Sequence, residues 1–375
     1  MINDKCLRVL VVDDTIVYRK IVSDVLAELP DVEVVGTASN GKIAMSKIAT
    51  LKPDLLTLDI EMPEMDGLEV LARIKAETPD IEAVMLSSLT QKGSDMTIKA
   101  LELGAFDFVP KPQSGSREEN KKAIAFALAP MLKAFARRQV MRSILKGKSV
   151  PSEPAVYNKA ADHSKGLVQP MKTITRQKGM TSEIVGIGIS TGGPNALAQM
   201  MTRLPADLGV PVLIVQHMPP VFTQSLAASL NSKCALQVRE AVDGETIRPN
   251  TALITPGGKQ MRVVAGADGK SRIVRITDDP PENSCKPSVD YLFRSIAYHY
   301  VGRATGVIMT GMGSDGTLGV KLMKRNGATI IAQNEATCVV YGMPKEPIEA
   351  GIVDVIAPLD KIADEICQTV GWLAR

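Results

Sequence analysis

The sequence contains 375 residues with a formal net charge of +3, 45% hydrophobic residues and 23% charged residues. This length is too great for one average domain and suits two, each large enough to bury its own core. The near-neutral charge and the aromatic content of 3% argue against a nucleic-acid-binding surface, which needs a basic patch and rings for stacking on bases.

Cysteine content and hydropathy indicate a protein of a reducing compartment. The five cysteines are scattered, odd in number and without a CxxC pair, so neither a disulfide framework nor a structural zinc site is predicted. No apolar run approaches the roughly 18 to 20 residues that span a bilayer, and the N-terminus lacks the apolar core of a signal peptide. We therefore expect a cytoplasmic protein with no direct membrane insertion.

Residues 1–125 alternate short apolar runs with amphipathic segments. The alternation predicts buried parallel strands with helices between them, which is a doubly wound α/β domain whose sites gather at the carboxyl ends of the strands. The expected strands are 7–12, 32–38, 55–58, 83–86 and 106–109, and the clearest helices are 16–29 and 67–77.

Residues 126–182 connect the two halves of the chain. Residues 121–145 have the pattern of one long helix that leads out of the first domain. From 146 to 182 the apolar period is lost, and seven basic residues stand against two acidic ones among Pro, Ser and Gln. This composition predicts a flexible, basic tether.

Strand and helix patterns return in residues 183–375 and predict a second doubly wound, Rossmann-like α/β domain. The expected strands are 184–189, 211–215, 251–255, 305–309 and 329–333, and the expected helices are 225–231, 288–300 and 318–326. Residues 263–276 predict a hairpin that turns at Asp268-Gly269.

Three carboxylates are expected to meet at the carboxyl edge of the first sheet. Asp13 and Asp14 follow the first strand, and Asp59 follows the third. Left unpaired they would repel one another and raise each other's pKa, and a Mg²⁺ ion bound by their oxygens relieves that repulsion. Ser87 ends the fourth strand and Lys111 follows the fifth, so a hydroxyl and an ammonium can hold a phosphoryl group there. Acidic strand caps placed by chance do not explain all five positions.

The segments VVDD, LDIEMPEMDG, MLSS and FVPKP, spread over about residues 5–125, resemble the receiver domain of bacterial response regulators. The resemblance implies a flavodoxin-like fold and a histidine kinase as phosphodonor. It implies these roles: phosphate acceptor Asp59, metal ligands Asp13 and Asp14, switch hydroxyl Ser87, and phosphate contact Lys111. Phe108 stands where many receivers carry a switch tyrosine or another aromatic residue, so a packing switch is retained without a hydroxyl.

The second domain opens with a glycine-rich turn, GIGISTGG at residues 186–193, between a predicted strand and a predicted helix. A dinucleotide-binding fingerprint needs glycine at position 191, where this chain has Thr191. The pattern G-x-S-x-G is satisfied around Ser190, whose small neighbours permit a tight turn that exposes the hydroxyl. The N–H of Thr191 can then stabilise an oxyanion. On the motif alone, a loop that cradles phosphate fits equally well.

Histidine decides between these two interpretations, because the chain has only three. His163 lies in the predicted tether and His299 lies within a predicted helix. His217 directly follows an apolar strand, at the same sheet edge as Ser190. We therefore predict a serine hydrolase in which Ser190 attacks the substrate and His217 acts as base and then as acid.

A carboxylate must orient the histidine. Asp207 precedes its strand, so it falls on the wrong edge of the sheet. Asp315 follows the strand 305–309 at a carboxyl end, and we predict that it completes a triad with His217. The weaker candidates are Asp278, Asp279 and Asp290.

Five further segments resemble, in order, the catalytic domain of chemotaxis protein-glutamate methylesterases: GISTGGPNAL, VQHMPPVFT, KPSVDYLFRS, TGMGSDG and VVYGMP. The resemblance covers about residues 183–370, and with the receiver in front the whole chain is similar to that two-domain enzyme. It implies phosphorylation-activated hydrolysis of glutamyl methyl esters, and deamidation of glutamines, on cytoplasmic helices of methyl-accepting chemoreceptors. It implies no cofactor for ester hydrolysis, and it implies that Met312 helps form the oxyanion hole. A packing role is the alternative for Met312.

Two other classes of protein are alternatives to the hydrolase. A transcriptional response regulator needs a compact, basic helix-turn-helix module, whereas this output half is long, glycine-rich and near neutral outside the tether. An inactive scaffold that binds receptors has no need of Ser190, His217 and Asp315 together. The sequence therefore favours the hydrolase.

Overall fold

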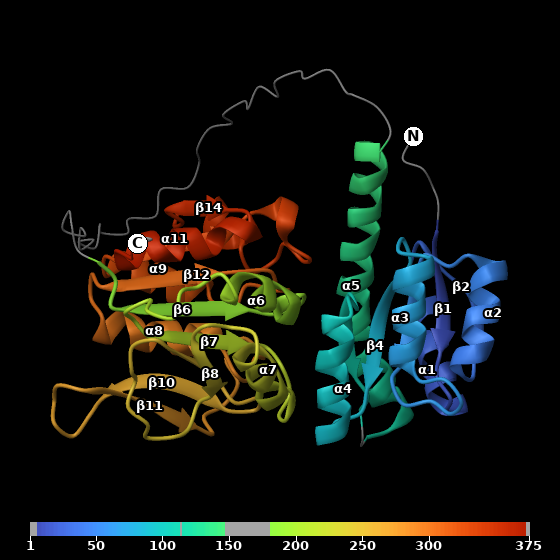
Figure 1. The fold of residues 1–375 in the computed structure, drawn as a ribbon, viewed down its shortest axis with the longest axis horizontal. Coiled ribbons are helices and arrows are strands. Elements are labelled where there is room, and N and C mark those ends of the chain that lie inside the picture. The colour runs from blue at the N-terminus through green and yellow to red at the C-terminus, as the bar shows by residue number, and fades with distance from the viewer. Residues whose placement is uncertain (1–5, 113–114, 147–180, 373–375) are drawn as a thin grey trace.

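The computed structural model describes residues 6–112, 115–146 and 181–372, and it contains two α/β units built on parallel sheets (Figure 1). The predicted fold class is therefore confirmed. Most of the predicted tether, with His163, lies outside the described residues, and the predicted boundaries 1–125, 126–182 and 183–375 stay a prediction. In the described ranges no helix combines the length and the apolar character needed to cross a membrane.

The first unit is a five-stranded parallel sheet with the order β2-β1-β3-β4-β5, flanked by helices. Its strands are β1 (Leu7–Val12), β2 (Val32–Ala38), β3 (Leu55–Asp59), β4 (Glu82–Ser87) and β5 (Asp107–Pro110). Its helices are α1 (Ile16–Ala27), α2 (Gly41–Leu51), α3 (Gly67–Glu77), α4 (Gln91–Glu102) and α5 (Arg117–Lys146). All five strands were predicted, because buried parallel strands appear in sequence as continuous apolar runs.

Local sequence explains where the helices of this unit begin. Asp66 caps α3 by accepting a hydrogen bond from the Glu69 N–H, and Glu69 returns one to the Asp66 N–H. Asn40 caps α2 by accepting a hydrogen bond from the Ile43 N–H. The long α5 continues past Pro130 and packs its apolar face on the sheet through Ile124, Leu128, Met131, Leu132 and Phe135.

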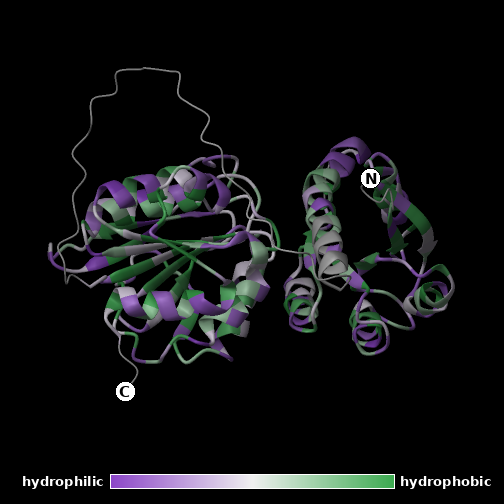
Figure 2. Cartoon of the chain, turned by 90° about the horizontal axis from the view of Figure 1, so that it is seen from above, coloured by the Kyte–Doolittle hydropathy of each residue, from purple (hydrophilic) through white to green (hydrophobic). Residues whose placement is uncertain are grey.

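The second unit is a seven-stranded parallel sheet with the order β14-β13-β12-β6-β7-β9-β8. Its strands are β6 (Ile184–Ile189), β7 (Val212–Gln216), β8 (Gln237–Glu240), β9 (Thr251–Ile254), β12 (Ala304–Ile308), β13 (Thr329–Gln333) and β14 (Val355–Ala357). Its helices are α6 (Gly193–Met201), α7 (Phe222–Asn231), α8 (Val289–His299), α9 (Thr317–Arg325), α10 (Lys345–Glu349) and α11 (Ile362–Val370), with 3₁₀ turns η1 (Glu335–Thr337) and η2 (Leu359–Lys361). In Figure 2 hydrophobic residues follow the strands, and hydrophilic residues colour the outer helix faces.

The predicted hairpin is confirmed as β10 (Gln260–Ala265) paired antiparallel with β11 (Arg272–Thr277). The sequence reading missed β8 and β14, which lie at the two edges of the large sheet. β8 reads QVRE and β14 has only three residues. Neither offers the continuous apolar run that marks a central strand, because an edge strand is buried less completely.

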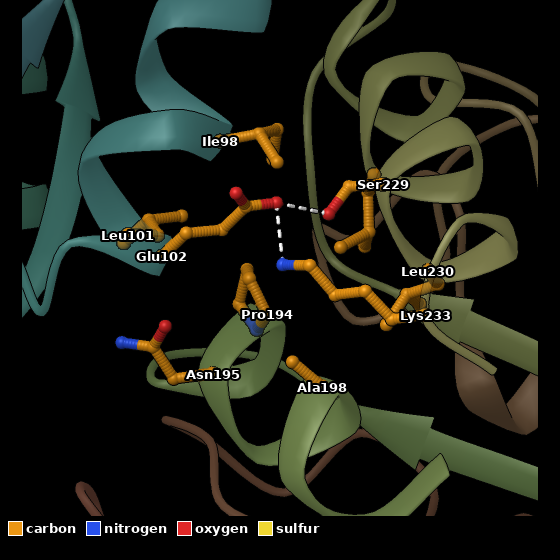
Figure 3. Close-up of a pocket in the computed structure, with 10 residues that line it drawn as sticks. Ile98, Leu101, Glu102, Pro194, Asn195, Ala198, Ser229, Leu230 and Lys233 are labelled. Carbon is orange, nitrogen blue, oxygen red and sulfur yellow. Dashed lines mark hydrogen bonds and ion pairs between the residues drawn. The ribbon is translucent and has the colours of Figure 1, made fainter. Parts of the chain in front are cut away.

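The two units meet where α4 and β5 of the first face α6 and α7 of the second. The ring of Phe108 on β5 stacks on the ring of Phe222 on α7, with centroids 4.8 Å apart. Ser225 of α7 lies 2.8 Å from the hydroxyl of Ser94 on α4. Glu102 accepts from Ser229 and pairs with Lys233 at 2.6 Å, and the three residues line a cavity of about 160 Å³ (Figure 3).

Candidate functional site

Ser190 lies in a sharp turn between β6 and α6. Its backbone N–H donates to Thr310 O at 2.9 Å, and its carbonyl accepts from the Gly193 N–H at 2.8 Å. Gly192 has a φ of 74°, and a Cβ added there would lie 2.5 Å from Val339 Cβ. The turn therefore requires glycine at this position, and it leaves the Ser190 side chain partly exposed at the carboxyl edge of the sheet.

His217 lies beside Ser190 at the end of the neighbouring strand. In the β6–β7 register Ile189 pairs with Gln216, and the His217 N–H donates to Ile189 O at 3.1 Å. Its Nε2 lies 2.9 Å from Oδ2 of Asp315. Ser190 Oγ forms no hydrogen bond with the described residues. Ser190 and His217 are therefore related only by their positions at the ends of neighbouring strands. Nδ1 lies 4.0 Å from Sγ of Cys285, and because Nε2 faces Asp315, Nδ1 is the imidazole nitrogen left to receive a proton.

Asp315 is held by five hydrogen-bond donors and is almost fully buried. Besides His217, they are the side chains of Asn283 and Ser288 and the N–H groups of Val289 and Asp290. Burial alone would raise the pKa of Asp315, but the bonds from His217, Val289 and Asn283 lower it below its usual value. The start of α8 supplies three of these donors, so this helix N-terminus faces a carboxylate.

The same contacts change the basicity of the imidazole. Burial by itself would lower the pKa of His217, but the hydrogen bond to Asp315 and the adjacent Cys285 sulfur outweigh it and raise the pKa to about 9. Asp290 lies behind Asp315, and burial together with the Asp315 charge raises the pKa of Asp290 to about 6. The Asn283 amide donates to both carboxylates, at 2.8 Å to Asp290 and 3.1 Å to Asp315.

Two backbone N–H groups are available near Ser190. A Cβ added to Gly311 would lie 2.7 Å from Ser190 Cβ, so the segment from Thr310 to Met312 passes directly beside the serine. Within the described ranges, neither the Thr191 N–H nor the Met312 N–H donates a hydrogen bond. Their position and free donors fit the predicted oxyanion hole.

The alternative carboxylates make other contacts. Asp207 precedes β7 and accepts from Trp372 Nε1 at 3.0 Å. Asp278 pairs with Lys259, and Asp279 accepts from the hydroxyl of Tyr291. Of the four alternatives weighed from sequence, Asp290 alone contacts Asp315, through its N–H. Asp315 is thus the carboxylate that reaches the imidazole, as the sheet-edge argument expects.

The three carboxylates of the first unit also come together. Oxygens of Asp13, Asp14 and Asp59 lie within 4.8 Å of one another, and Lys111 Nζ lies 2.7 Å from both Asp13 and Asp59. Burial raises the pKa of Asp59 to about 6; Lys111 opposes this rise, and the Asp13 and Asp14 charges add to it. Carboxylates that repel one another in this way suit a hard divalent cation such as Mg²⁺.

The two predicted switch residues contact elements at the boundary between the two units. The Ser87 hydroxyl lies 2.5 Å from Thr97 Oγ1 and donates to Gly93 O at 3.2 Å, so it bonds to α4. Phe108 is buried against Phe222, as described above. Both residues therefore contact the elements that form the contact between the two units.

Asp107 was not singled out from the sequence, yet it joins the two sites. Its buried carboxylate accepts the Gly192 N–H at 2.8 Å and the Phe108 N–H at 2.9 Å. Burial raises the pKa of Asp107 to about 6, although the bonds from Gly192 and Phe108 oppose the shift. A side chain of the first unit thus bonds the turn that carries Ser190. No sequence signal marks Asp107, because it lies at the amino end of β5.

Both parts of the chain are similar to known protein families. A family model described as CheB methylesterase matches residues 185–366, and one described as response regulator receiver domain matches residues 9–124. A protein-glutamate methylesterase/protein-glutamine glutaminase of Desulfotalea psychrophila is 54% identical and covers 98% of this chain and 99% of its own. The protein of the same name from Trichodesmium erythraeum is 42% identical over 97% of this chain and 99% of its own.

Two solved structures from Thermotoga maritima are also similar. The CheB methylesterase catalytic domain is 40% identical and covers 50% of this chain and 99% of its own, with a TM-score of 0.49. The CheB response regulator domain is 40% identical and covers 35% of this chain and 95% of its own, with a TM-score of 0.31.

Proposed function

Because this chain belongs to the protein-glutamate methylesterase/protein-glutamine glutaminase family, whose members are hydrolases, we propose that it removes methyl groups from glutamyl methyl esters of chemoreceptors under the control of its receiver domain. The observation that carries the proposal is the His217–Asp315 pair at 2.9 Å beside the turn of Ser190. The rival transcription factor or inactive scaffold has no use for such a pair. The protein then acts in sensory adaptation of chemotaxis, in the cytoplasm.

The proposed mechanism starts from the hydrogen bond between Nε2 of His217 and Asp315. Ser190 Oγ attacks the ester carbonyl and passes its proton to Nδ1 of His217, since Nε2 is bonded to Asp315. The N–H groups of Thr191 and Met312 stabilise the oxyanion. His217 returns the proton to the leaving methoxide, and methanol departs.

Hydrolysis of the acyl-enzyme repeats the sequence with water. His217 takes a proton from the water that attacks the ester carbonyl, and Ser190 leaves with that proton to restore the free enzyme. Glutamate is the product. An amide substrate follows the same steps with ammonia as leaving group, which gives the glutaminase activity of receptor glutamines. No step calls for a cofactor.

The receiver pocket supplies the regulatory input. Asp59 accepts a phosphoryl group from a histidine kinase, with Asp13, Asp14 and Asp59 as the residues that hold Mg²⁺. The ion neutralises charge on the phosphoryl oxygens when it is bound. Lys111, 2.7 Å from Asp59, contacts the phosphoryl group, and Ser87 leaves its bonds to α4 to do the same.

Contacts between the units provide the link from this pocket to Ser190. Movement of Ser87 and Lys111 toward a phosphoryl group pulls on α4 and on the end of β5, which carry Ser94 and Phe108. Loss of the Phe108–Phe222 stack and of the Asp107–Gly192 bond then frees the active-site face for a receptor helix. A tenfold activation requires about 1.4 kcal/mol of differential stability, which a few such contacts supply.

The test is release of methanol from a methylated chemoreceptor cytoplasmic fragment by the purified full chain. Wild type should release methanol, and Ser190→Ala should not. Phosphodonor and Mg²⁺ should increase the wild-type rate. Binding of the receptor fragment without any methanol release would overturn the proposal and favour the scaffold.

A further inference from the structure

Cys285 has no part in the proposed ester hydrolysis, yet its thiol lies in the same cluster as the triad residues. Its Sγ is 4.0 Å from Nδ1 of His217, while Nε2 of the same ring is 2.9 Å from Asp315. One ligand atom from each of the three residues lies within 4.8 Å of the other two. A thiol, an imidazole and a carboxylate thus converge from three separate segments of the chain.

The position of Cys285 is fixed by its backbone. Glu282 and Cys285 exchange two backbone hydrogen bonds, the Cys285 N–H donating at 2.7 Å and the Glu282 N–H at 3.1 Å. Between them Asn283 and Ser284 have φ angles of 51° and 62°. This closed turn directs the thiol toward His217, and Asn283 also bonds Asp315. The three side chains are therefore held together by the same loop contacts that orient the triad.

We propose that Cys285, His217 and Asp315 form a site for Zn²⁺ and that zinc bound there switches the hydrolase off. Zinc takes Cys S at about 2.3 Å, His N at about 2.0 Å and carboxylate O at about 2.0 to 2.2 Å. Ligand atoms around a tetrahedral zinc ion are then about 3.4 to 3.6 Å apart. The separations of 2.9 and 4.0 Å are to different nitrogens of the imidazole, and a zinc ion binds only one of them. With one ligand atom taken from each residue, the three atoms lie within 4.8 Å of one another, so the ring must turn and the side chains must close in by about 1 Å to reach the spacing of a zinc site.

The donor set selects the kind of metal. A thiolate with an imidazole favours zinc over Mg²⁺ or Ca²⁺, which prefer oxygen ligands only. Three protein ligands leave a fourth position for water, as in open zinc sites. His217 and Cys285 are both partly exposed, so an ion can enter from solvent. The thiol proton leaves to solvent when the sulfur binds the metal.

Zinc at either imidazole nitrogen stops the proposed reaction. At Nδ1 it occupies the lone pair that accepts the Ser190 proton. At Nε2 it replaces the hydrogen bond to Asp315 that orients the ring. Inhibition therefore rests on the proposed function, whereas zinc binding does not.

Binding is tested with Co²⁺ as a spectroscopic substitute for zinc, because a thiolate–Co²⁺ bond gives a near-ultraviolet charge-transfer band. The full chain is titrated in excess Mg²⁺, which fills the Asp13, Asp14 and Asp59 cluster; that cluster has no sulfur in any case. We expect the band in wild type at one equivalent, its removal by Zn²⁺, and its absence in Cys285→Ser. Cys234→Ser, a matched control on another loop, should keep the band. No band in wild type, or an unchanged band in Cys285→Ser, would overturn the site.

Inhibition is tested by methanol release with added Zn²⁺. Zinc should lower the wild-type rate at least tenfold, a chelator should restore it, and Cys285→Ser should need at least tenfold more zinc. Cys285→His should lose the Co²⁺ band but keep the inhibition, because histidine replaces one zinc ligand by another. Wild type that binds Co²⁺ but hydrolyses at full rate with zinc contradicts the inhibitory role. Wild type that shows the band but releases no methanol without zinc contradicts the proposed function instead.

Discussion

Both units place a buried aspartate at the carboxyl edge of a parallel sheet, but they surround it differently. Five donors hold Asp315. Burial raises the pKa of Asp315, but the bonds from His217, Val289 and Asn283 outweigh burial and lower it. Around Asp59 the balance is reversed, because burial and the charges of Asp13 and Asp14 raise its pKa to about 6 against the effect of Lys111. The same residue type in the same topological position thus has opposite electrostatic surroundings.

The difference matches the two proposed roles. An aspartate that orients a histidine must keep its charge and its direction through the whole reaction, and fixed donors provide both. An aspartate that accepts a phosphoryl group needs an open face and neighbours that bind a cation. The surroundings of Asp315 therefore fit the proposed orienting role, and those of Asp59 fit the proposed phosphate acceptor beside a cation.

The largest expected effect is on hydrolysis in the second unit, where Ser190 is the proposed nucleophile. Ser190→Ala removes the nucleophile without filling or emptying the core, since the side chain is small and partly exposed. Methanol release should fall by roughly 10⁴ to 10⁶-fold with the thermal unfolding curve unchanged. Activity within tenfold of wild type would rule out Ser190 as the nucleophile.

The role of the five hydrogen bonds to Asp315 is tested by Asp315→Asn. An amide cannot accept from all five donors, and it favours the wrong tautomer of His217, so kcat should fall by roughly 10⁴-fold. Asp207→Asn is the matched control; Asp207 contacts Trp372, and its replacement should cost less than tenfold on the same scale. The reverse ranking would show that the wrong carboxylate has been assigned.

The pH dependence of hydrolysis tests whether the contacts of His217 raise the pKa of its imidazole. The imidazole acts as a base only when it is unprotonated, and its pKa is raised to about 9. The rate should therefore rise by about tenfold per pH unit well below that value and level off above it, which makes hydrolysis at pH 9 about 50-fold faster than at pH 7. Phosphodonor should be omitted from these measurements. A rate that is flat from pH 7 to 9 would contradict the raised pKa.

The contact between the units is tested by Phe108→Ala and Phe222→Ala. Each removes one ring of a stack worth about 0.5 to 1.5 kcal/mol and should raise the basal rate by up to about tenfold. Phe222 is fully buried, so its variant is compared only if its thermal unfolding curve shows a folded second unit. Phe126→Ala is the control, because Phe126 on α5 is 72% exposed. It should leave the basal rate unchanged. Equal effects of all three replacements would argue against control through this contact.

The central strands could be predicted from sequence because strands that are buried on both faces appear as unbroken apolar runs. The bounds of β1 and β6 agree with the prediction to the residue, since both strands are buried on two faces and read as unbroken apolar runs. Ser190, His217 and Asp315 could be singled out because each follows such a strand. The edge strands β8 and β14 lack that pattern and were missed.

Residues that reach the sites from loops or from the other unit could not be predicted. Asn283 and Cys285 approach His217 and Asp315 from a turn with positive φ angles, which no periodicity reveals. Asp107 contacts Gly192 from a different sheet, so only the packing of the two units brings them together. The scattered cysteines argue against a structural zinc site. Their spacing in sequence does not reveal the cluster of Cys285, His217 and Asp315, because these residues come from three separate segments of the chain.

The central claim is that the pocket around Asp59 controls hydrolysis at Ser190, and one measurement tests it most directly. Methanol release from methylated receptor is followed for wild type and Asp59→Asn, each with and without a small-molecule phosphodonor and Mg²⁺. Wild type should accelerate by about tenfold or more, which corresponds to about 1.4 kcal/mol. Asp59→Asn should keep the unstimulated rate and lose the response. An Asp59→Asn enzyme that still accelerates, or a wild type that does not, would contradict the account.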